Sequence, residues 1–375
     1  MDGRRGGPRR GSAVRRGEEH HVSRLRRSSG FSLVELMVAI TIGLLLLTSL
    51  VGIMVVGRKD YSVDSAQGEL QSAGSTAANL IAQSARQAGF FGCSGSSTSY
   101  QLAAANGVLG NFTSPVTGYD AVLASSTLTL NSLNPANDNS LADWSPSLDA
   151  SLQGRVEKGS DVMIFSGQTN GSAPLWVNAY ASAGATSLPT QSTSGVATKN
   201  LLSVSNCGHS SIMQVSGVNG ASGAITLSQA LDSDFPPGSV AAPLAQTAYF
   251  VAQATGAQSA LYQATYDGTT AGWQLAPIVP GVDALQVWYG IGSTPGVTTE
   301  YVPASQVANW SQVNSLRIGM LLEGAQGSAP ALAGIGNGCG NPTSWTVLGA
   351  TVVVPCDTRL RHVYTMTVSL RNAGL

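Results

Sequence analysis

Charged side chains are scarce in this chain of 375 residues, where Asp, Glu, Lys and Arg together make up 10% and the formal net charge is −1. The cations are unevenly placed, because residues 1–30 hold nine of the 19 Lys and Arg side chains but only three of the 20 Asp and Glu. The rest of the chain is therefore acidic by seven charges. Clustered Lys and Arg are needed to neutralise phosphates, so this composition argues against a nucleic-acid-binding domain.

The sequence also lacks the short motifs of common enzymes and metal sites. It holds four cysteines and four histidines, with no CxxC pair and no histidine at the spacing of metal ligands. No GxSxG, HExxH or P-loop motif is present. Beyond residue 30 there are two histidines, His362 in a predicted strand and His209 in a predicted loop beside Cys207. We expect no catalytic residue, no metal and no other cofactor, and hence no enzyme.

One long apolar run is present, over residues 31–56, and it holds no charged side chain except Glu35. At a rise of 1.5 Å per residue it extends about 39 Å, enough to cross a bilayer with some tilt. The stronger basic cluster precedes it, so the positive-inside rule keeps residues 1–30 in the cytoplasm and exports the rest. A carboxylate inside hydrocarbon costs at least ~2.5 kcal/mol, so Glu35 needs a partner.

The position of small residues suggests how that partner arises. A secretory signal has a shorter apolar region that is followed by its cleavage site, whereas here the small-residue break at Gly30 precedes the apolar run. Cleavage after Gly30 would leave the run on the mature protein and create an α-amine on Phe31. That amine and the Glu35 carboxylate would neutralise each other, preferably between neighbouring chains, because the amine is tethered to the first turn of its own helix. The run is therefore predicted to be an assembly element as well as an anchor.

The segment GFSLVELMVAITIGLLLL resembles the N-terminal signature of type IV prepilins and of type II secretion pseudopilins. The resemblance implies that a prepilin peptidase cuts after Gly30 and methylates the new N-terminal Phe31, and that Glu35 guides subunit docking. It also implies a single-pass inner-membrane protein with a periplasmic C-terminal domain, which later moves into a pilus on the cell surface. The leader is long for this family. A shorter one, VSRLRRSSG, begins at Val22, and we hypothesise that translation starts there.

Export favours disulfides among the four cysteines, which allow three connectivities. The pair that encloses the shortest loop is the easiest to close, and the alternative of free buried thiols stays open. The resulting candidate pairs are Cys339 with Cys356 and Cys93 with Cys207.

Beyond the membrane segment the pattern predicts an α+β fold, with one long helix packed on an antiparallel sheet. Apolar residues at three- and four-residue steps extend the helix to about Ala88, with Gly89 as its stop and a hinge at Gly57 as the alternative. We expect a cleaved leader at 1–30, a pilin-type helix at 31–89 and an exported β-rich domain at 90–375. Alternating and apolar runs predict strands at 127–130, 161–165, 224–227, 249–253, 261–266, 282–289, 316–322, 347–354 and 363–370.

Four segments after the membrane run, RQAGFFGC, GVDALQVWYG, SLRIGMLLEG and RLRHVYTMTVSLRN, resemble the PilW family of minor pilins. That resemblance implies a minor pilin in a priming or tip complex, whose partners are prepilin peptidase, other minor and major pilins, the pilus assembly platform and membrane lipid. A minor pseudopilin of type II secretion is the first alternative. The second is a membrane-anchored periplasmic binding protein or enzyme, which would need a concave site with converging polar groups.

Overall fold

A computed structural model describes residues 32–92, 98–100, 102, 108–130, 136–169, 171–253, 258–329, 343–355 and 357–372. The chain divides into two compact units at Gly57, inside its one long helix, and each unit is described by itself. The first unit holds the apolar start of the helix. The second holds the rest of the helix and all the strands.

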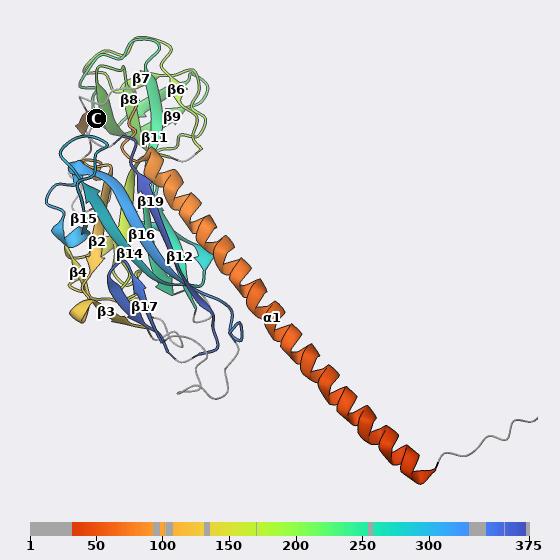
Figure 1. The fold of residues 1–375 in the computed structure, drawn as a ribbon. Helices are drawn as coiled ribbons and strands as arrows, with labels where there is room; N and C mark the ends of the chain where they lie inside the picture. The colour runs from red at the N-terminus through yellow and green to blue at the C-terminus, as the bar shows by residue number, and fades with distance from the viewer. Residues whose placement is uncertain are drawn as a thin grey trace, which may run out of the picture. The chain divides into compact units, whose positions relative to one another are not determined.

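Helix α1 runs without a break over Leu33–Gln87 (Figure 1). It begins after Ser32, whose hydroxyl oxygen accepts the Glu35 backbone N–H at 3.2 Å and so satisfies one of the free donors of the first turn. It ends where Gly89 adopts a φ of +76°, a left-handed conformation that glycine tolerates best. The Gly89 N–H then donates to the carbonyl of Ser166 at 2.8 Å. The predicted continuous helix and its stop are confirmed, and Gly57 does not interrupt it.

The largest sheet has twelve strands and is mostly antiparallel. Its main path is β4 (Trp144–Ser145), β2 (Val116–Ala121), β5 (Val162–Gln168), β11 (Val240–Gln253), β8 (Leu201–Ser205), β9 (Ser210–Asn219), β10 (Ala224–Leu227) and β7 (Ser187–Pro189). Four further strands join it from the side: β1 (Thr98–Tyr100) on β9, β6 (Leu175–Trp176) and β12 (Ser259–Tyr266) on β11, and β13 (Gln274–Pro280) on β12.

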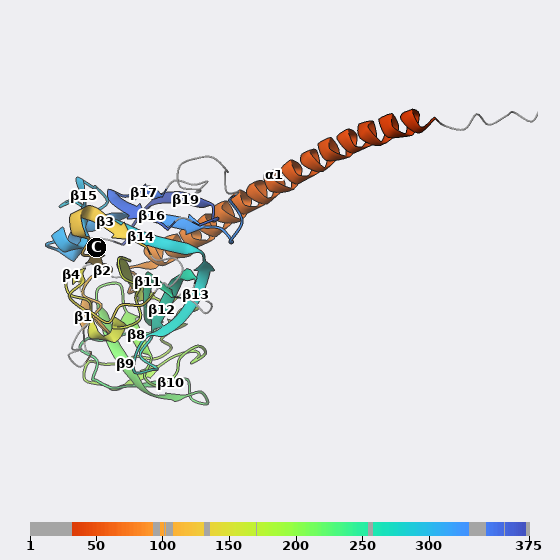
Figure 2. The same ribbon diagram turned by 90° about the horizontal axis from the view of Figure 1, so that it is seen from below.

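Two smaller sheets complete the second unit, and Figure 2 shows the four-stranded one as a layer separate from the strands of the large sheet. The four-stranded sheet has the order β15 (Glu300–Pro303), β14 (Val282–Ile291), β16 (Val313–Glu323) and β19 (Arg361–Ser369). The three-stranded sheet joins β17 (Ser344–Val347), β18 (Ala350–Val353) and β3 (Thr127–Thr129). Single 3-10 turns lie at Ala124–Ser126, Ala150–Leu152, Ala304–Gln306 and Trp310–Gln312. The paired strands are antiparallel except β1 with β9 and β18 with β3.

The main core forms where the second half of α1 packs between two of these sheets. Ile81 of the helix belongs to one buried cluster with Phe165 of β5 and Met320 of β16. The helix can approach closely because its inner face carries small residues: a Cβ added to Gly74 would lie 2.6 Å from the ring of Tyr364. The predicted helix face against a sheet is therefore confirmed.

A buried carboxylate ties the large sheet to the four-stranded sheet. Asp161, next to β5, accepts the backbone N–H of Ala121 at 2.9 Å and that of Val287 at 2.7 Å. Because Asp161 is fully buried, desolvation raises the pKa of its carboxyl well above the usual value. The two strands that it joins, β2 and β14, belong to different sheets.

The strand predictions were correct for β10 and overlap β3, β5, β11, β12, β14, β16 and β19. The single strand predicted at 347–354 is wrong, because the chain turns at Leu348 and Gly349, both with positive φ, and forms the hairpin of β17 and β18. Several strands of the large sheet were not predicted, among them β2, β8, β9 and β13.

Candidate assembly interface

Glu35 lies on the first turn of α1 and is exposed. The segment from Ser32 to Glu35 has the S-x-x-E spacing of a capping box, in which the serine side chain caps the third residue of the helix. The hydrogen bond from the Glu35 backbone N–H to the Ser32 hydroxyl, which is one half of that box, is formed. The sequence analysis did not predict this cap, although the S-x-x-E motif signals it. Within the described residues no partner is recorded for the Glu35 carboxylate. Gly30 and Phe31 lie outside the described residues, so the predicted pairing between amine and carboxylate stays a prediction.

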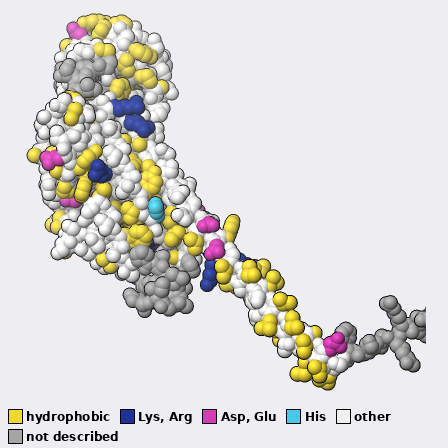
Figure 3. Space-filling model, viewed as in Figure 1, with side chains coloured by type: hydrophobic (Ala, Val, Ile, Leu, Met, Phe, Trp, Pro, Cys, Tyr) yellow, Lys and Arg dark blue, Asp and Glu magenta, His cyan; other side chains and the backbone are white. Residues whose placement is uncertain are grey.

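The first part of α1 is apolar on every side. Its most apolar stretch has a mean hydropathy of 2.5 and none of it is buried, so by length and composition the helix can cross a membrane. Figure 3 shows hydrophobic side chains along this part of the helix. A soluble surface helix would be apolar on one side only. Large hydrophobic side chains that are at least half exposed include Leu33, Val34, Leu36, Met37, Ile40, Leu45, Leu50, Ile53 and Met54.

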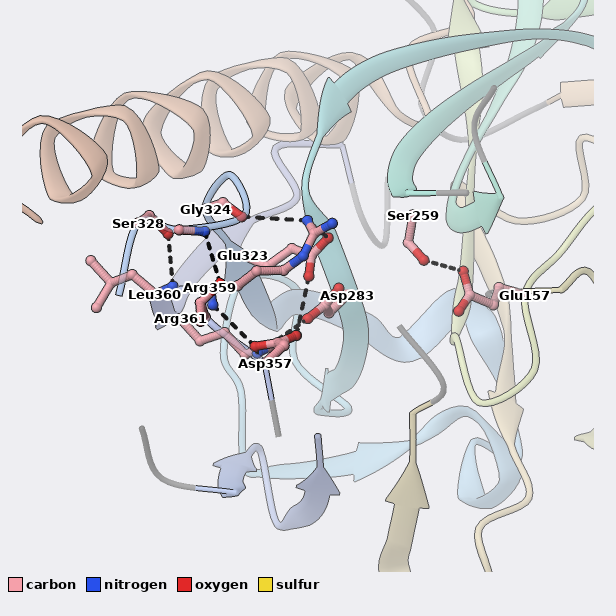
Figure 4. A network of polar contacts seen from close by, with 12 residues as sticks. Glu157, Ser259, Asp283, Glu323, Gly324, Ser328, Asp357, Arg359, Leu360 and Arg361 are labelled. Carbon is pink, nitrogen blue, oxygen red and sulfur yellow. Dashed lines mark hydrogen bonds and ion pairs between the residues drawn. The ribbon is translucent and has the colours of Figure 1, made fainter. Parts of the chain in front are cut away.

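A buried network of charges lies where three strands of the four-stranded sheet begin or end (Figure 4). Arg361 donates to Asp283 at 2.8 Å, to Glu323 at 3.1 Å and, with two nitrogens, to Asp357 at 2.8 Å. Arg359 donates to Glu323 at 2.9 Å. Three carboxylates thus share two guanidiniums. Burial and the nearby charge of Asp283 raise the pKa of Glu323 to about 8. The arrangement clamps β14, β16 and β19 together.

A second buried carboxylate, Glu157, contacts a hydroxyl rather than a cation. Ser259 donates to its Oε2 at 2.7 Å, and the Glu157 backbone N–H donates to the carbonyl of Val251 at 2.9 Å. Burial raises the pKa of Glu157 to about 7. Spacing along the chain could not identify the partners of these carboxylates, because the partners lie far away in sequence; Ser259 is 102 residues away from Glu157.

The two histidines lie in different settings. His362 is exposed on β19, as expected for a surface position. His209 precedes β9, and its Nε2 lies 2.8 Å from Asp232. The hydroxyls of Ser99 and Ser211 both donate to that same carboxylate. Because the hydroxyl protons are directed to the carboxylate, the group resembles a structural clamp more than a serine activated by an imidazole.

Cys207 is disulfide-bonded and adopts a φ of +66° in the turn before β9. Cys93, Cys339 and Cys356 lie outside the described residues. The two predicted pairings therefore stay predictions. Among the described residues no group of three or more His, Cys, Asp or Glu side chains is placed to hold a metal ion.

Comparison with known proteins gives two family matches. Residues 248–372 match the family described as Type IV Pilus-assembly protein W, and residues 25–51 match the prokaryotic N-terminal methylation motif. A solved structure, the Type IV-like pilin TTHA1219 from Thermus thermophilus, is 19% identical over 36% of this chain and 70% of that chain, with a TM-score of 0.20. No curated protein matches.

The methylation motif spans Gly30, Phe31 and Glu35 and includes the start of helix α1. The first part of this helix is apolar, and its second part packs against antiparallel sheets. Together these features support a type IV pilin with an α+β fold, anchored in a membrane by its N-terminal helix and acting with prepilin peptidase and other pilins. The match over residues 248–372, which contains the four-stranded sheet and its charged network, supports a PilW-like minor pilin in type IV pilus assembly. The two family matches point to a structural component of a pilus rather than to an enzyme.

Proposed function

We propose that this minor pilin acts in the priming or tip complex that starts assembly of a type IV pilus. In this proposal prepilin peptidase cuts the leader 1–30 after Gly30 and methylates Phe31. Residues 31–56 then span the inner membrane once, with the domain of residues 90–375 in the periplasm. The assembly platform draws the subunit, together with other minor pilins and the major pilin, into the filament at the cell surface.

The observation that carries this proposal is the contrast within α1. Its first part exposes large apolar side chains on all sides and has one carboxylate, Glu35, near its start. Such a surface requires lipid or the apolar helices of other subunits around it. In the proposed assembly the amine of one subunit's Phe31 pairs with Glu35 of its neighbour, which removes the cost of an isolated charge in hydrocarbon.

Mass spectrometry of the N-terminal peptide tests the processing step in cells that carry the full gene cluster. We expect the mature protein from membranes and from sheared pili to begin with N-methylated Phe31. A Gly30→Leu variant is the control, because its larger side chain at the cleavage position should leave the leader attached and keep the protein out of pili. Recovery of the wild-type protein in pili with its arginine-rich leader intact would contradict the proposal.

A further inference from the structure

A cavity of about 550 Å³ lies where the three sheets of the second unit meet. It is lined by residues of β2 and β4 from the large sheet, of β14 and β15 from the four-stranded sheet, and of the turn between β17 and β18. The lining mixes apolar side chains, such as Leu123 and Pro303, with polar ones, such as Asp120 and Ser145. Both the volume, within the usual ~300–1,000 Å³, and this mixture are typical of a small-molecule site.

An aromatic ring enters this cavity from β14. Val287 and Tyr289 of the strand are buried in the main core. Strand alternation therefore places Gln286 and Trp288 on the opposite face, where both line the cavity. One edge of the indole lies against the turn between β17 and β18, because a Cβ added to Gly349 would be 3.2 Å from its Cζ2. The ring is half-buried, and among the described residues no acceptor is recorded for its Nε1–H.

Two acceptors that line the same cavity are incompletely paired. Asp120 accepts the Ser305 hydroxyl at 2.6 Å through Oδ2, and in the described part of the chain no donor to its Oδ1 is recorded. Gln286 is 6% exposed, and its amide nitrogen donates to the carbonyls of Gly159 at 3.1 Å and Leu285 at 3.0 Å. Its Oε1 has no recorded donor within the described residues. Acceptors that are largely screened from water and lack a donor favour a ligand that brings one.

The backbone at this cavity is held in conformations that residues other than glycine rarely adopt. Ser126 has a φ of +53° and Leu348 a φ of +43°, and both line the cavity. Such residues cost stability and gather at ligand sites, where the surrounding structure holds them in place.

The combination of groups indicates the chemistry of the occupant. A saccharide ring has an apolar C–H face that packs on an indole, and hydroxyls that donate to carboxylate and amide oxygens. A cationic side chain would also suit Trp288 and Asp120. However, Asp120 is the one charged side chain among the described residues that line the cavity, and the hydroxyls of Ser126 and Ser145 and the amide of Gln286 are neutral. A neutral ligand with several hydroxyls matches this set better than a cation.

We propose that the cavity binds a neutral saccharide, with one ring packed on Trp288 and hydroxyls bonded to Asp120 and Gln286. Saccharide binding does not depend on the proposed function, so its test needs no other pilin. The saccharides of the cell wall and those of surface polysaccharides share this chemistry, and the choice of probes distinguishes these two sources.

Isothermal titration calorimetry tests this proposal on the full-length protein, in a detergent without a sugar head group. The probes are triacetylchitotriose, maltotriose and galactotriose, with trilysine as the cationic alternative. We expect at least one trisaccharide to bind with a Kd of about 1 mM or lower. The Kd should not change with salt concentration, because the ligand is uncharged. Triacetylchitotriose consists of N-acetylglucosamine, a cell-wall sugar, so binding of this probe alone indicates wall glycan and binding of the others indicates surface polysaccharide.

Tryptophan substitutions locate the site. Trp288→Ala removes the ring from the cavity and should weaken the binding of the trisaccharide by about tenfold or more. Trp176→Ala is the matched control, because Trp176 is 47% exposed on β6 and is not among the described residues that line this cavity. If Trp288→Ala fails to fold, as judged by its thermal unfolding, photolabelling of the wild-type protein decides. A diazirine derivative of the bound trisaccharide should then label residues that line the cavity.

Three results would overturn the proposal. The first is that no trisaccharide binds, and the second is that Trp288→Ala binds as tightly as the wild-type protein or that the label falls elsewhere. The third is that trilysine alone binds, with an affinity that falls at high salt, which would show a cationic segment of a partner as the occupant. None of these results bears on the proposed function, which the N-terminal processing tests separately.

Discussion

The two parts of helix α1 have the same backbone conformation but opposite surroundings. Up to Val56 the helix is apolar except at Glu35 and a few small polar residues, and nearly all of its residues are exposed. From Ala66 onward it buries one narrow face and exposes most of its polar side chains. The second part draws its stability from packing against the sheets, as most helices in water do. The first part has no such packing in the monomer, so its surface depends on lipid or on other subunits. Equal substitutions in the two parts should therefore have unequal effects.

Isoleucine truncation should show the largest difference in stability. Ile81 is fully buried in the main core, whereas Ile53 is 72% exposed. We expect Ile81→Ala to lower the free energy of unfolding by about 2–5 kcal/mol, because it removes buried methyl groups and leaves a cavity. Ile53→Ala is the matched control and should leave the unfolding of the β-rich domain unchanged. Denaturant unfolding of the full-length protein in detergent measures both, and equal losses would contradict the contrast.

Glycine substitution should give a smaller difference, this time between the buried and the exposed face of the second part of α1. A Cβ at position 74 meets the ring of Tyr364 at 2.6 Å and Leu322 at 3.0 Å, so Gly74→Ala should cost about 1–3 kcal/mol through overpacking. Gly52 has nothing within 4 Å in its unit, and Gly68, also on α1, has open space around it too. Gly68→Ala should stabilise the helix by about 0.5–1 kcal/mol, because alanine has the higher helix propensity. The midpoints of thermal unfolding should move in opposite directions for these two variants.

Most of the helix was predictable from sequence, because both of its parts follow simple rules of periodicity and length. Ser32 and Gly89 even mark its two ends. The strands β8 and β9 were missed because serines occupy buried positions in them. Ser203, Ser205, Ser210 and Ser211 are at most 1% exposed, so the usual alternation of apolar and polar residues is absent.

The charged network was beyond prediction for a different reason. Asp283, Glu323 and Arg361 come from three strands, and only the register of the sheet brings them together. No spacing in the sequence encodes that register. Glu35 could be recognised from the sequence because the residues next to it along the chain are apolar. The partner proposed for it belongs to another chain, so this sequence alone could not identify it.

The buried carboxylates predict a pH dependence that is confined to the second part of the molecule. The pKa of Glu157 is raised to about 7 and that of Glu323 to about 8, mainly by burial. The folded state therefore holds these protons more tightly than the unfolded state. The stability that they contribute is complete below pH ~4.5 and is lost as the pH rises through 7 to 8.

We therefore expect the thermal midpoint of the β-rich domain to fall between pH 5 and pH 8, and to fall less in a Glu157→Gln variant, whose amide oxygen still accepts from Ser259. A midpoint that rises over this range, or an unchanged slope in the variant, would contradict the assignment for Glu157. Membrane retention of the protein, which depends on the first part of α1, should not change with pH.

The central claim is that Glu35 serves assembly and not the stability of the folded chain. The most direct measurement is the number of pili on cells expressing Glu35→Gln, with Glu69→Gln as the matched control on the exposed, polar part of α1. We expect Glu35→Gln to reach the membrane in normal amounts with unchanged unfolding of its β-rich domain, and yet to reduce piliation by about tenfold or more, the factor that corresponds to 1.4 kcal/mol of lost pairing. Cells that express the control variant should carry the normal number of pili. Normal piliation with Glu35→Gln would contradict the account.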